Sequence, residues 1–279
     1  MAAQEDFSNH EFPMTDGDFK KIREIAYART GISLTDHKKN MIYGRLARRL
    51  RRLNLKSFRE YCDLLVQEDT EENIEFVNSI TTNLTSFFRE NHHFEHLKNT
   101  VLPGLMRKNL GSRRIRIWSA GCSTGEEAYS IAMVVKSFAS LSNWDVKVLA
   151  TDLDSNVVAK AKEAIYAAER AENIPDKYKV CFSIDKSRKK VKIKDNVRKL
   201  ITFKQLNLLH EWPMKGPFDI IFCRNVVIYF DANTQRKLFD RYADIMTEQS
   251  TLFIGHSESL HNITSRFGSI GRTIYERRH

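Results

Sequence analysis

The sequence predicts an α/β protein, in which a Rossmann-like sheet domain with a small antiparallel insertion follows a small all-helical domain. No strand pattern appears before Arg113, whereas from Arg114 onward short apolar runs alternate with helical patterns. This alternation is typical of βαβ units, which build a mostly parallel sheet with helices on both faces. Between Ala168 and Leu200 the alternation stops, and Val191 and Ile193 alternate with lysines as in a strand. We therefore expect domains at 1–85 and 86–279, with the insertion at 168–200.

The composition fits a folded chain without a membrane anchor. A hydrophobic content of 42% over 279 residues is ordinary for a folded protein of two domains. No apolar run approaches the roughly 18 residues that span a bilayer. The segment from Met1 to Phe12 lacks the basic and then apolar build of a signal peptide. The four cysteines are scattered without a CxxC pair, which argues against zinc and disulfides. We expect a cytoplasmic protein that binds no metal.

The first domain is expected to contain four helices. In the stretch that begins at Asp16, apolar residues recur at helical spacing, and Gly31 is placed to end the helix. Further helices are expected from near Asp36, over Ser57–Gln67 and over Thr70–Thr81.

The net charge of +10 is unevenly distributed along the chain. The second helix has seven basic residues and no acidic one between Lys38 and Arg52, and another basic cluster runs from Asp185 to Lys199. Such clusters indicate an acidic partner: nucleic acid, an anionic lipid surface or an acidic protein surface. A solvated helix face is the alternative explanation.

Polar residues follow several expected strands of the second domain. The strands are expected at Ile115–Trp118, Val146–Ala150, Ile201–Gln205, Phe218–Cys223, Thr251–Ile254 and Thr273–Glu276, and the helices near Glu126–Ala139, Asn156–Ala167 and Thr234–Met246. Open α/β sheets bind ligands beyond the carboxyl ends of their strands. The residues placed there are Ser119–Gly125 with Glu126 and Glu127, Asp152, Asn207 with Leu208, and Arg224, Asn225 and Tyr229.

The acidic turn after the first strand decides between ligand classes. Gly121 and Gly125 form no G-x-G-x-x-G pattern, and no Gly-Lys-Ser/Thr ending follows, so a dinucleotide or P-loop nucleotide is disfavoured. Glu126 and Glu127 would repel a diphosphate, and Asp152 lies about 30 residues beyond the turn instead of about 20. S-adenosylmethionine offers ribose hydroxyls to Asp152 and two cationic groups to the acids, and it carries no phosphate.

Each of these features also has a purely structural explanation. The two glycines permit a tight turn, and the two glutamates stabilise the start of a helix. An Asp at a strand end, either Asp152 or Asp154, often caps the next helix. Their combination at one sheet edge is what favours a cofactor site.

Six segments carry a family resemblance. They are TTNLTSFFRENHHF, WSAGCSTGEEAYSIA, TDLD, NLL, IFCRNVVIYF and FIGHSES, and they extend from Thr81 to Ser259. Together with the basic helical domain, they resemble the chemotaxis receptor methyltransferases of the CheR type over nearly the whole chain. The resemblance implies a class I methyltransferase fold, with S-adenosylmethionine as cofactor and S-adenosylhomocysteine as product. It also implies a protein-glutamate O-methyltransferase that forms methyl esters on the cytoplasmic helical bundle of chemoreceptors during chemotactic adaptation.

The resemblance implies roles for individual residues. It places Asn83, Thr85, Arg89, Glu127, Asp152, Asn207, Leu208, Arg224 and Asn225 at the cofactor, and Arg89 with Tyr229 beside the transferred methyl group. Asp152 would hold the ribose. Arg89 would hold either the carboxylate of the substrate or that of the cofactor, and Tyr229 would contact the reacting centre or else pack behind a strand.

The insertion departs from one pattern in the family. Members that bind a C-terminal receptor tether add it as an edge strand, and they tend to carry a glycine-containing loop there. The stretch from Cys181 to Asp195 contains no glycine. We therefore expect an enzyme that does not depend on the tether.

Other functions have weaker support. A nucleic-acid methyltransferase would share the cofactor fold, but it usually needs an aromatic clamp for a flipped base. The segment RNVVIYF offers only a loose version of such a clamp. A hydrolase would use GHSES, Gly255 to Ser259, whose fifth residue is Ser where the nucleophile elbow has Gly. A cofactor-sensing module without catalysis is a third alternative. His92, His93 and His256 are expected to be structural, and we expect a monomer that binds no nucleic acid and does not insert into membranes.

Overall fold

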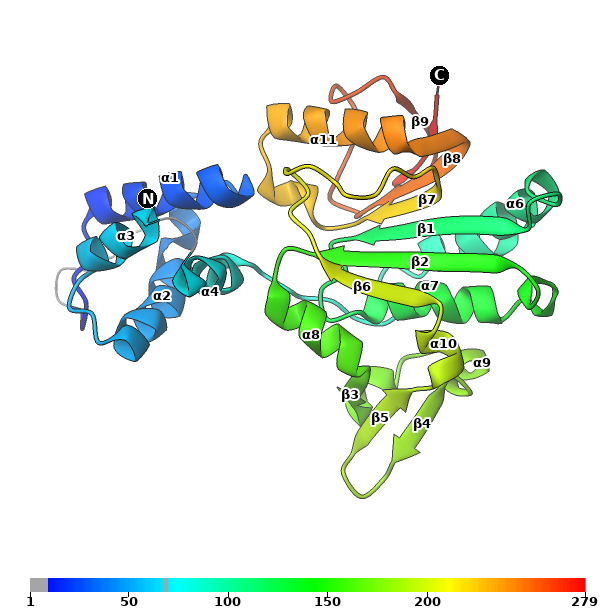
Figure 1. Ribbon diagram of the computed structural model, residues 1–279, viewed down its shortest axis with the longest axis horizontal. Helices are drawn as coiled ribbons and strands as arrows, with labels where there is room; N and C mark the ends of the chain where they lie inside the picture. Colours follow the sequence, from blue (N-terminus) through cyan, green and yellow to red (C-terminus); the bar gives the residue numbers. More distant parts are fainter. Residues whose placement is uncertain (1–9, 68–69, 279) are drawn as a thin grey trace. The chain divides into compact units, whose positions relative to one another are not determined.

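The chain divides into a helical unit and a sheet unit (Figure 1). The computed structural model describes residues 10–67 and 70–278. The helical unit contains Met1–Thr82 and Tyr229–Asp231, and the sheet unit contains Asn83–Ile228 and Ala232–His279. The residues behind the signal-peptide expectation lie largely outside the described part of the chain. Within that part, no helix combines the length and the apolar character that crossing a membrane requires.

The helical unit is built from short helices with regular ends. They are α1 (Asp16–Thr30), the 3-10 turn η2 (Asp36–Lys38), α2 (Lys39–Leu53), α3 (Phe58–Val66) and α4 (Glu71–Ile80). At the start of α1, the Thr15 hydroxyl accepts the N–H of Asp18, whose carboxylate accepts the N–H of Thr15. Gly31 ends this helix in the left-handed region, at φ 70°, and donates its N–H to the C=O of Tyr27. The predicted role of Gly31 is therefore confirmed.

A buried ion pair joins α2 to α4. The Arg49 guanidinium donates to Glu72 at 3.0 and 2.5 Å and to Glu75 at 3.0 Å, and the Tyr61 hydroxyl donates to Glu72 at 2.7 Å. Because two carboxylates balance its charge, Arg49 adds little to the positive field of the unit.

The sheet unit confirms the predicted fold class. Its main sheet contains β6 (Ile201–Gln205), β2 (Asp145–Asp152), β1 (Arg114–Ala120), β7 (Phe218–Cys223), β8 (Met246–Ile254), β10 (Ile274–Arg277) and β9 (Phe267–Gly271), in that spatial order. The first five strands are parallel, and β10 pairs antiparallel with both β8 and β9. The strand order reverses between β1 and β7, which is where doubly wound sheets bind their ligands.

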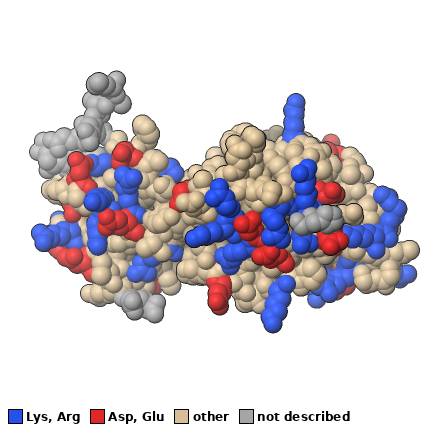
Figure 2. Space-filling model, turned by 90° about the horizontal axis from the view of Figure 1, so that it is seen from above, with Lys and Arg blue, Asp and Glu red and all other residues tan. Residues whose placement is uncertain are grey.

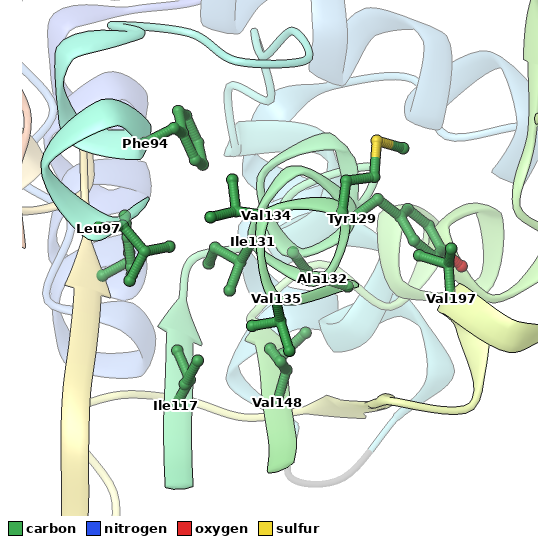
Figure 3. Close-up of a cluster of buried hydrophobic side chains, with 14 of the residues drawn as sticks. Phe94, Leu97, Ile117, Tyr129, Ile131, Ala132, Val134, Val135, Val148 and Val197 are labelled. Atoms are coloured by element: carbon green, nitrogen blue, oxygen red, sulfur yellow. The ribbon is translucent and has the colours of Figure 1, made fainter. Parts of the chain in front are cut away.

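Helices cover both faces of this sheet (Figure 1). After α4, the helices and helical turns along the chain are α5 (His92–His96), the π-helical turn η3 (Leu97–Val101), α6 (Leu102–Lys108), α7 (Glu126–Lys136), η4 (Ala139–Leu141), α8 (Ser155–Glu163), η5 (Ala168–Ala171), α9 (Asp176–Lys179), α10 (Asp195–Arg198), η6 (Val227–Tyr229) and α11 (Ala232–Ile245). Figure 1 shows α11 on one side of the sheet and α7 and α8 on the other. Ile131 and Val135 of α7 lie close to Ile117 and Val148 of the strands beneath (Figure 3). All residues of α7 except Lys136 are buried, which explains its nearly continuous apolar sequence.

The insertion is antiparallel, as predicted, but its first strand begins at Ile165. The helix expected over Asn156–Ala167 ends at Glu163, because Ala164 adopts a left-handed φ of 59°. Residues Ile165–Ala167 form β3, which joins β5 (Lys190–Ile193) and β4 (Phe182–Asp185) in the order β3-β5-β4. β4, β5 and the turn between them lie within the stretch without glycine, Cys181 to Asp195, from which tether independence is expected. That expectation stays a prediction.

Other helix boundaries also differ from the expectation. The helices expected to reach Ala139 and Met246 end at Lys136 and Ile245. The sequence pattern does not predict β9 at all, because its glycines and serine leave only Phe267 and Ile270 as strand formers.

Candidate active site

The turn between β1 and α7 depends on two glycines. Gly121 and Gly125 have φ of 97° and 96°. A Cβ atom would lie 2.3 Å from Val226 Cγ2 at the first position and 2.8 Å from Ala161 Cβ at the second. Both the backbone conformation and the space therefore require glycine. The N–H of Gly121 donates to the C=O of Thr151 at 2.8 Å, which ties the turn to the end of β2.

Asp152 holds this turn from the end of β2. Its carboxylate accepts the N–H of Ser123 at 2.7 Å and the N–H of Asp154 at 3.0 Å. Burial raises the pKa of Asp152 to about 6, although these N–H groups oppose the rise. The cap of α8 is Asp154, whose Oδ1 accepts the N–H groups of Asn156 and Val157 at 2.9 and 3.4 Å. Asp152 is thus not the helix cap, and its oxygens keep lone pairs for further donors.

The neighbouring acids Glu126 and Glu127 face different partners. Glu126 is fully buried and forms an ion pair with Arg170 of the insertion. Glu127 accepts a hydrogen bond from the Ser119 hydroxyl at 2.7 Å and forms an ion pair with Arg224 at 2.9 Å. Burial raises the pKa of the Glu127 carboxyl, and the Arg224 guanidinium opposes that rise. Only Glu127 therefore belongs to the cluster around Arg224.

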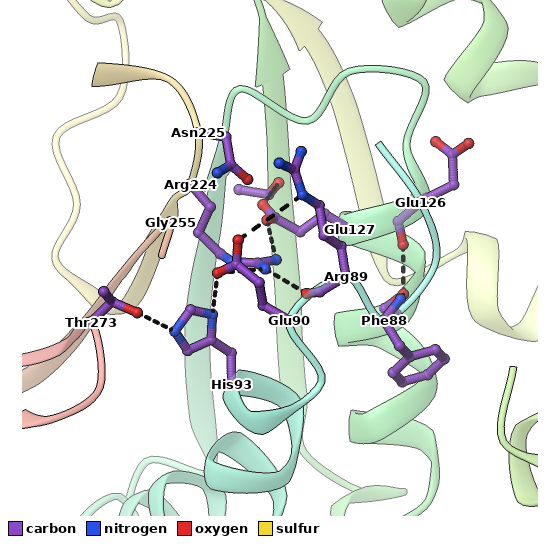
Figure 4. A network of polar contacts seen from close by, with 12 residues as sticks. Phe88, Arg89, Glu90, His93, Glu126, Glu127, Arg224, Asn225, Gly255 and Thr273 are labelled. Atoms are coloured by element: carbon purple, nitrogen blue, oxygen red, sulfur yellow. Dashed lines mark hydrogen bonds and ion pairs between the residues drawn. The ribbon is translucent and has the colours of Figure 1, made fainter. Parts of the chain in front are cut away.

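A network of charged groups surrounds the Arg224 guanidinium (Figure 4). Besides Glu127, it contacts the carboxylate of Glu90 at 3.3 Å and donates to the C=O of Arg89. Burial raises the pKa of Glu90, but a 2.9 Å hydrogen bond from His256 and the charge of Arg224 outweigh it and leave the pKa at about 2. Within the described residues, the buried Arg224 Nε has no hydrogen-bond partner, and Glu90 Oε2 has the ion pair with Arg224 but no hydrogen bond of regular geometry. Such atoms are what a polar ligand would satisfy.

The bend before α5 is bound to the loop after β2 and to the insertion. Asn83 Nδ2 donates to Asp154 at 2.7 Å, and the C=O of Thr85 accepts a hydrogen bond from Arg170 at 3.4 Å. The side chain of Arg89 is 30% exposed, and one of its nitrogens donates to a C=O of the same bend at 2.8 Å. Arg89 therefore keeps donors for a ligand, whereas Arg224 is surrounded by protein groups.

The remaining predicted residues follow β6 and β7 along the chain, and all but one belong to the sheet unit. Asn207 accepts the N–H of Leu209 at 3.0 Å, Leu208 is buried, and Asn225 has a left-handed φ of 59°. These residues belong to the sheet unit. Tyr229 groups with the helical unit, where the Lys38 ammonium lies 4.6 Å from the centre of its ring. The structure thus gathers nine of the ten predicted residues in one unit.

Three residues around the site, Glu90, Arg170 and Glu258, were not predicted from the sequence. Glu90 directly follows Arg89 in a segment quoted for the resemblance, so its position was the available signal. Glu258 likewise lies in a quoted segment, FIGHSES. Arg170 gives no local signal, because its partners Glu126 and Thr85 are distant along the chain.

The geometry also bears on a metal site and on a hydrolase. The described part of the chain contains no group of three His, Cys, Asp or Glu side chains that could hold a metal ion. Residues 255–266, all of which are described, form turns and no helix. A nucleophile elbow requires a helix directly after its serine, so GHSES is not one.

The cluster fits the cofactor that the sequence suggests. Glu127 and Glu90 pair with Arg224, Glu90 also lies 4.0 Å from Arg89, and Asp152 holds the neighbouring turn. The three acids outnumber the two guanidinium groups. A surplus of negative charge suits a ligand with a sulfonium and an ammonium group, and it disfavours a diphosphate.

Comparisons with known proteins agree with this chemistry. Residues 83–275 match the family description "CheR methyltransferase, SAM binding domain", and residues 17–81 match "CheR methyltransferase, all-alpha domain". A "Probable chemotaxis protein methyltransferase" of Rhizobium etli is 44% identical, over 90% of this chain and 96% of the relative. "Chemotaxis protein methyltransferase 2" of Pseudomonas aeruginosa is 42% identical over 96% of both chains. The "Chemotaxis protein methyltransferase" of Escherichia coli is 40% identical, over 94% of this chain and 91% of the relative.

The raised pKa of Asp152 generates a prediction for ligand binding. If its carboxylate accepts the ribose hydroxyls, the affinity for S-adenosylhomocysteine falls about fourfold between pH 7.5 and 5.5, because about a quarter of Asp152 stays ionised at the lower pH. The folded pKa is raised, so protonation of this group favours the folded state, and unfolding through Asp152 does not explain the loss. Calorimetry at both pH values measures the effect. Asp152→Asn is the control: weak binding with the same fourfold change would contradict the assignment.

Proposed function

We propose, because this chain belongs to the CheR methyltransferase family, that it transfers a methyl group from S-adenosylmethionine to glutamate side chains of chemoreceptors. The products are glutamate methyl esters. The observation that carries the proposal is the acidic glycine turn beside Arg224, which suits a cationic nucleoside without phosphate. Names of the relatives support a role in chemotaxis.

The proposed reaction needs little acid–base chemistry from the protein. When bound, S-adenosylmethionine supplies an electrophilic methyl group on its sulfonium. A glutamate side chain has a pKa of about 4.3, so the attacking carboxylate is already ionised at neutral pH. The residues of this chain must remove water from that carboxylate and hold it in line.

Arg89 is proposed to hold the substrate carboxylate. An arginine can bind a carboxylate through two parallel hydrogen bonds, and the Arg89 side chain is the more exposed of the two guanidinium groups in the cluster, at 30% against 2% for Arg224. Arg224 has Glu127, Glu90 and a backbone C=O around it, and it is proposed to orient the acids. We propose Asn83, Thr85, Arg89, Glu127, Asp152, Asn207, Leu208, Arg224 and Asn225 as the cofactor site, with Tyr229 beside the methyl group.

A transfer assay tests the function directly. The chain is incubated with methyl-labelled S-adenosylmethionine and, in separate reactions, with chemoreceptor-containing membranes, RNA or DNA. Label in the receptor that mild base releases is expected, because methyl esters are base-labile. Label in nucleic acid with none in the receptor would favour the rival methyltransferase and overturn the proposal.

The assignment of the two catalytic residues predicts different losses. Arg89→Ala lowers kcat about 100-fold by misplacing the carboxylate, and Tyr229→Phe lowers it about tenfold. If Arg89 holds the substrate, its loss leaves the affinity for S-adenosylhomocysteine within about threefold of the wild type. Steady-state kinetics and calorimetry measure both quantities. The control is Arg107→Ala, an exposed change on α6; near-full turnover in both test variants would refute the roles.

The basic face of α2 is proposed to dock the receptor. A pocket of the helical unit is lined by Arg45, Arg48, Arg49, Arg52, Asn78, Ser79 and Thr81. Arg45 donates to backbone C=O groups there, and Arg49 is neutralised. Arg48 and Arg52 are exposed and form no ion pair with the described residues. The face drawn in Figure 2 shows basic and acidic side chains interspersed. The pocket itself is lined by four arginines and by no acidic residue.

Docking by charge predicts a dependence on salt. The kcat/KM for the receptor falls as ionic strength rises, because salt screens the attraction between the arginines and an acidic helix. The double change Arg48→Glu and Arg52→Glu lowers kcat/KM about tenfold at low salt and flattens the dependence. Arg107→Glu, a single charge reversal on α6 of the sheet unit, is the control and leaves both unchanged. Wild-type rates that are flat between low and moderate salt would show that α2 does not steer the substrate.

A further inference from the structure

The loops that follow β7 and β8 share one buried carboxylate. The two strands end side by side, with Cys223 paired to Ile254. The chain then continues into residues 224–228 and 255–258. Glu258 belongs to the second loop and is 6% exposed, and its carboxylate contacts both loops.

Four backbone N–H groups converge on Glu258. Its Oε2 accepts the N–H of Asn225 at 2.9 Å and that of Gly255 at 2.5 Å. Its Oε1 accepts the N–H of Val227 at 3.0 Å and that of Ile228 at 3.4 Å. An ionised carboxylate offers about four acceptor sites and no donor, so it matches these four donors. A neutral amide would turn an NH₂ group towards two of them.

The loop held by Glu258 is tightly confined. Asn225 is a non-glycine residue at φ 59°, a conformation that persists only where the surroundings enforce it. A Cβ atom on Gly255 would lie 2.8 Å from the backbone nitrogen of Asn225, and one on Gly121 would lie 2.3 Å from Val226. The loop thus fits between the end of β8 and the acidic turn, with Glu258 as its anchor.

We propose that Glu258 is a positioning residue for methyl transfer, which fixes the loop that carries Arg224 and Asn225. The inference rests on the proposed assignment of those two residues to the cofactor. Glu258 itself faces backbone N–H groups, so it acts through the loop. The same loop leads directly along the chain into Tyr229.

The test compares Glu258→Gln with a matched change at the other end of β7. Asp219 is also 6% exposed and accepts the N–H of Arg116 at 2.8 Å and Nδ2 of Asn109 at 3.2 Å. Asp219→Asn therefore removes a buried carboxylate from the same sheet, but near the amino ends of the strands. Both variants are expected to lower Tm.

The two variants are expected to differ in cofactor binding. By calorimetry well below either Tm, Glu258→Gln raises the Kd for S-adenosylhomocysteine at least tenfold and lowers kcat, with the KM for receptor little changed. Asp219→Asn leaves that Kd within twofold of the wild type. If Glu258→Gln does not fold, Glu258→Asp, which keeps the charge on a shorter stem, is expected to raise the Kd at least threefold.

Two results would overturn the inference alone. One is an unchanged Kd in the folded Glu258 variant, and the other is an equal rise in Asp219→Asn, which would show a general effect of lost stability. A wild-type chain that does not bind S-adenosylhomocysteine would instead overturn the proposed function, and this inference with it.

Discussion

The buried guanidinium of Arg224 is the interaction on which the rest of the site depends. Removing Glu127 and Glu90 from water is costly, and a nearby opposite charge at 2.9 and 3.3 Å repays part of that cost. Without Arg224, the carboxylates would repel one another or take up protons. With it, the turn after β1 remains acidic yet stable. A single cation therefore joins the end of β7, the start of α7 and the bend before α5 into one cluster.

The two adjacent glutamates show how neighbours in sequence acquire separate tasks. Glu126 points to the insertion, where Arg170 neutralises it, and Glu127 points to Arg224. Successive helical residues differ by about 100° in direction, which separates their partners. Asp152 and Asp154 divide in the same way, since Asp154 caps α8 and Asp152 holds the turn. Each pair contains one acid committed to the fold and one proposed for the ligand.

Local patterns were sufficient for the fold class and for most of the sheet. Phe218–Cys223 is apolar except for Asp219 and was predicted to the residue, because a central parallel strand is buried on both faces. β9 lacks such a run, so it was not predicted. The end of α8 was also placed wrongly, because Ala164 stands at the left-handed position where a glycine would mark the end of a helix. The site residues were likewise predictable only where a local pattern marks them. Residues at strand ends could be predicted from the sheet alone, whereas Glu90, Arg170 and Glu258 acquire their partners through tertiary contacts that no spacing reveals.

Arg170 connects the small antiparallel insertion to the main sheet domain. It belongs to η5, yet it contacts Glu126 at the start of α7 and the C=O of Thr85 in the bend. Replacing the insertion by a short linker would leave the fully buried carboxylate of Glu126 without its ion-pair partner and would release one end of the bend. A shortened catalytic domain made from this chain therefore has to retain the insertion.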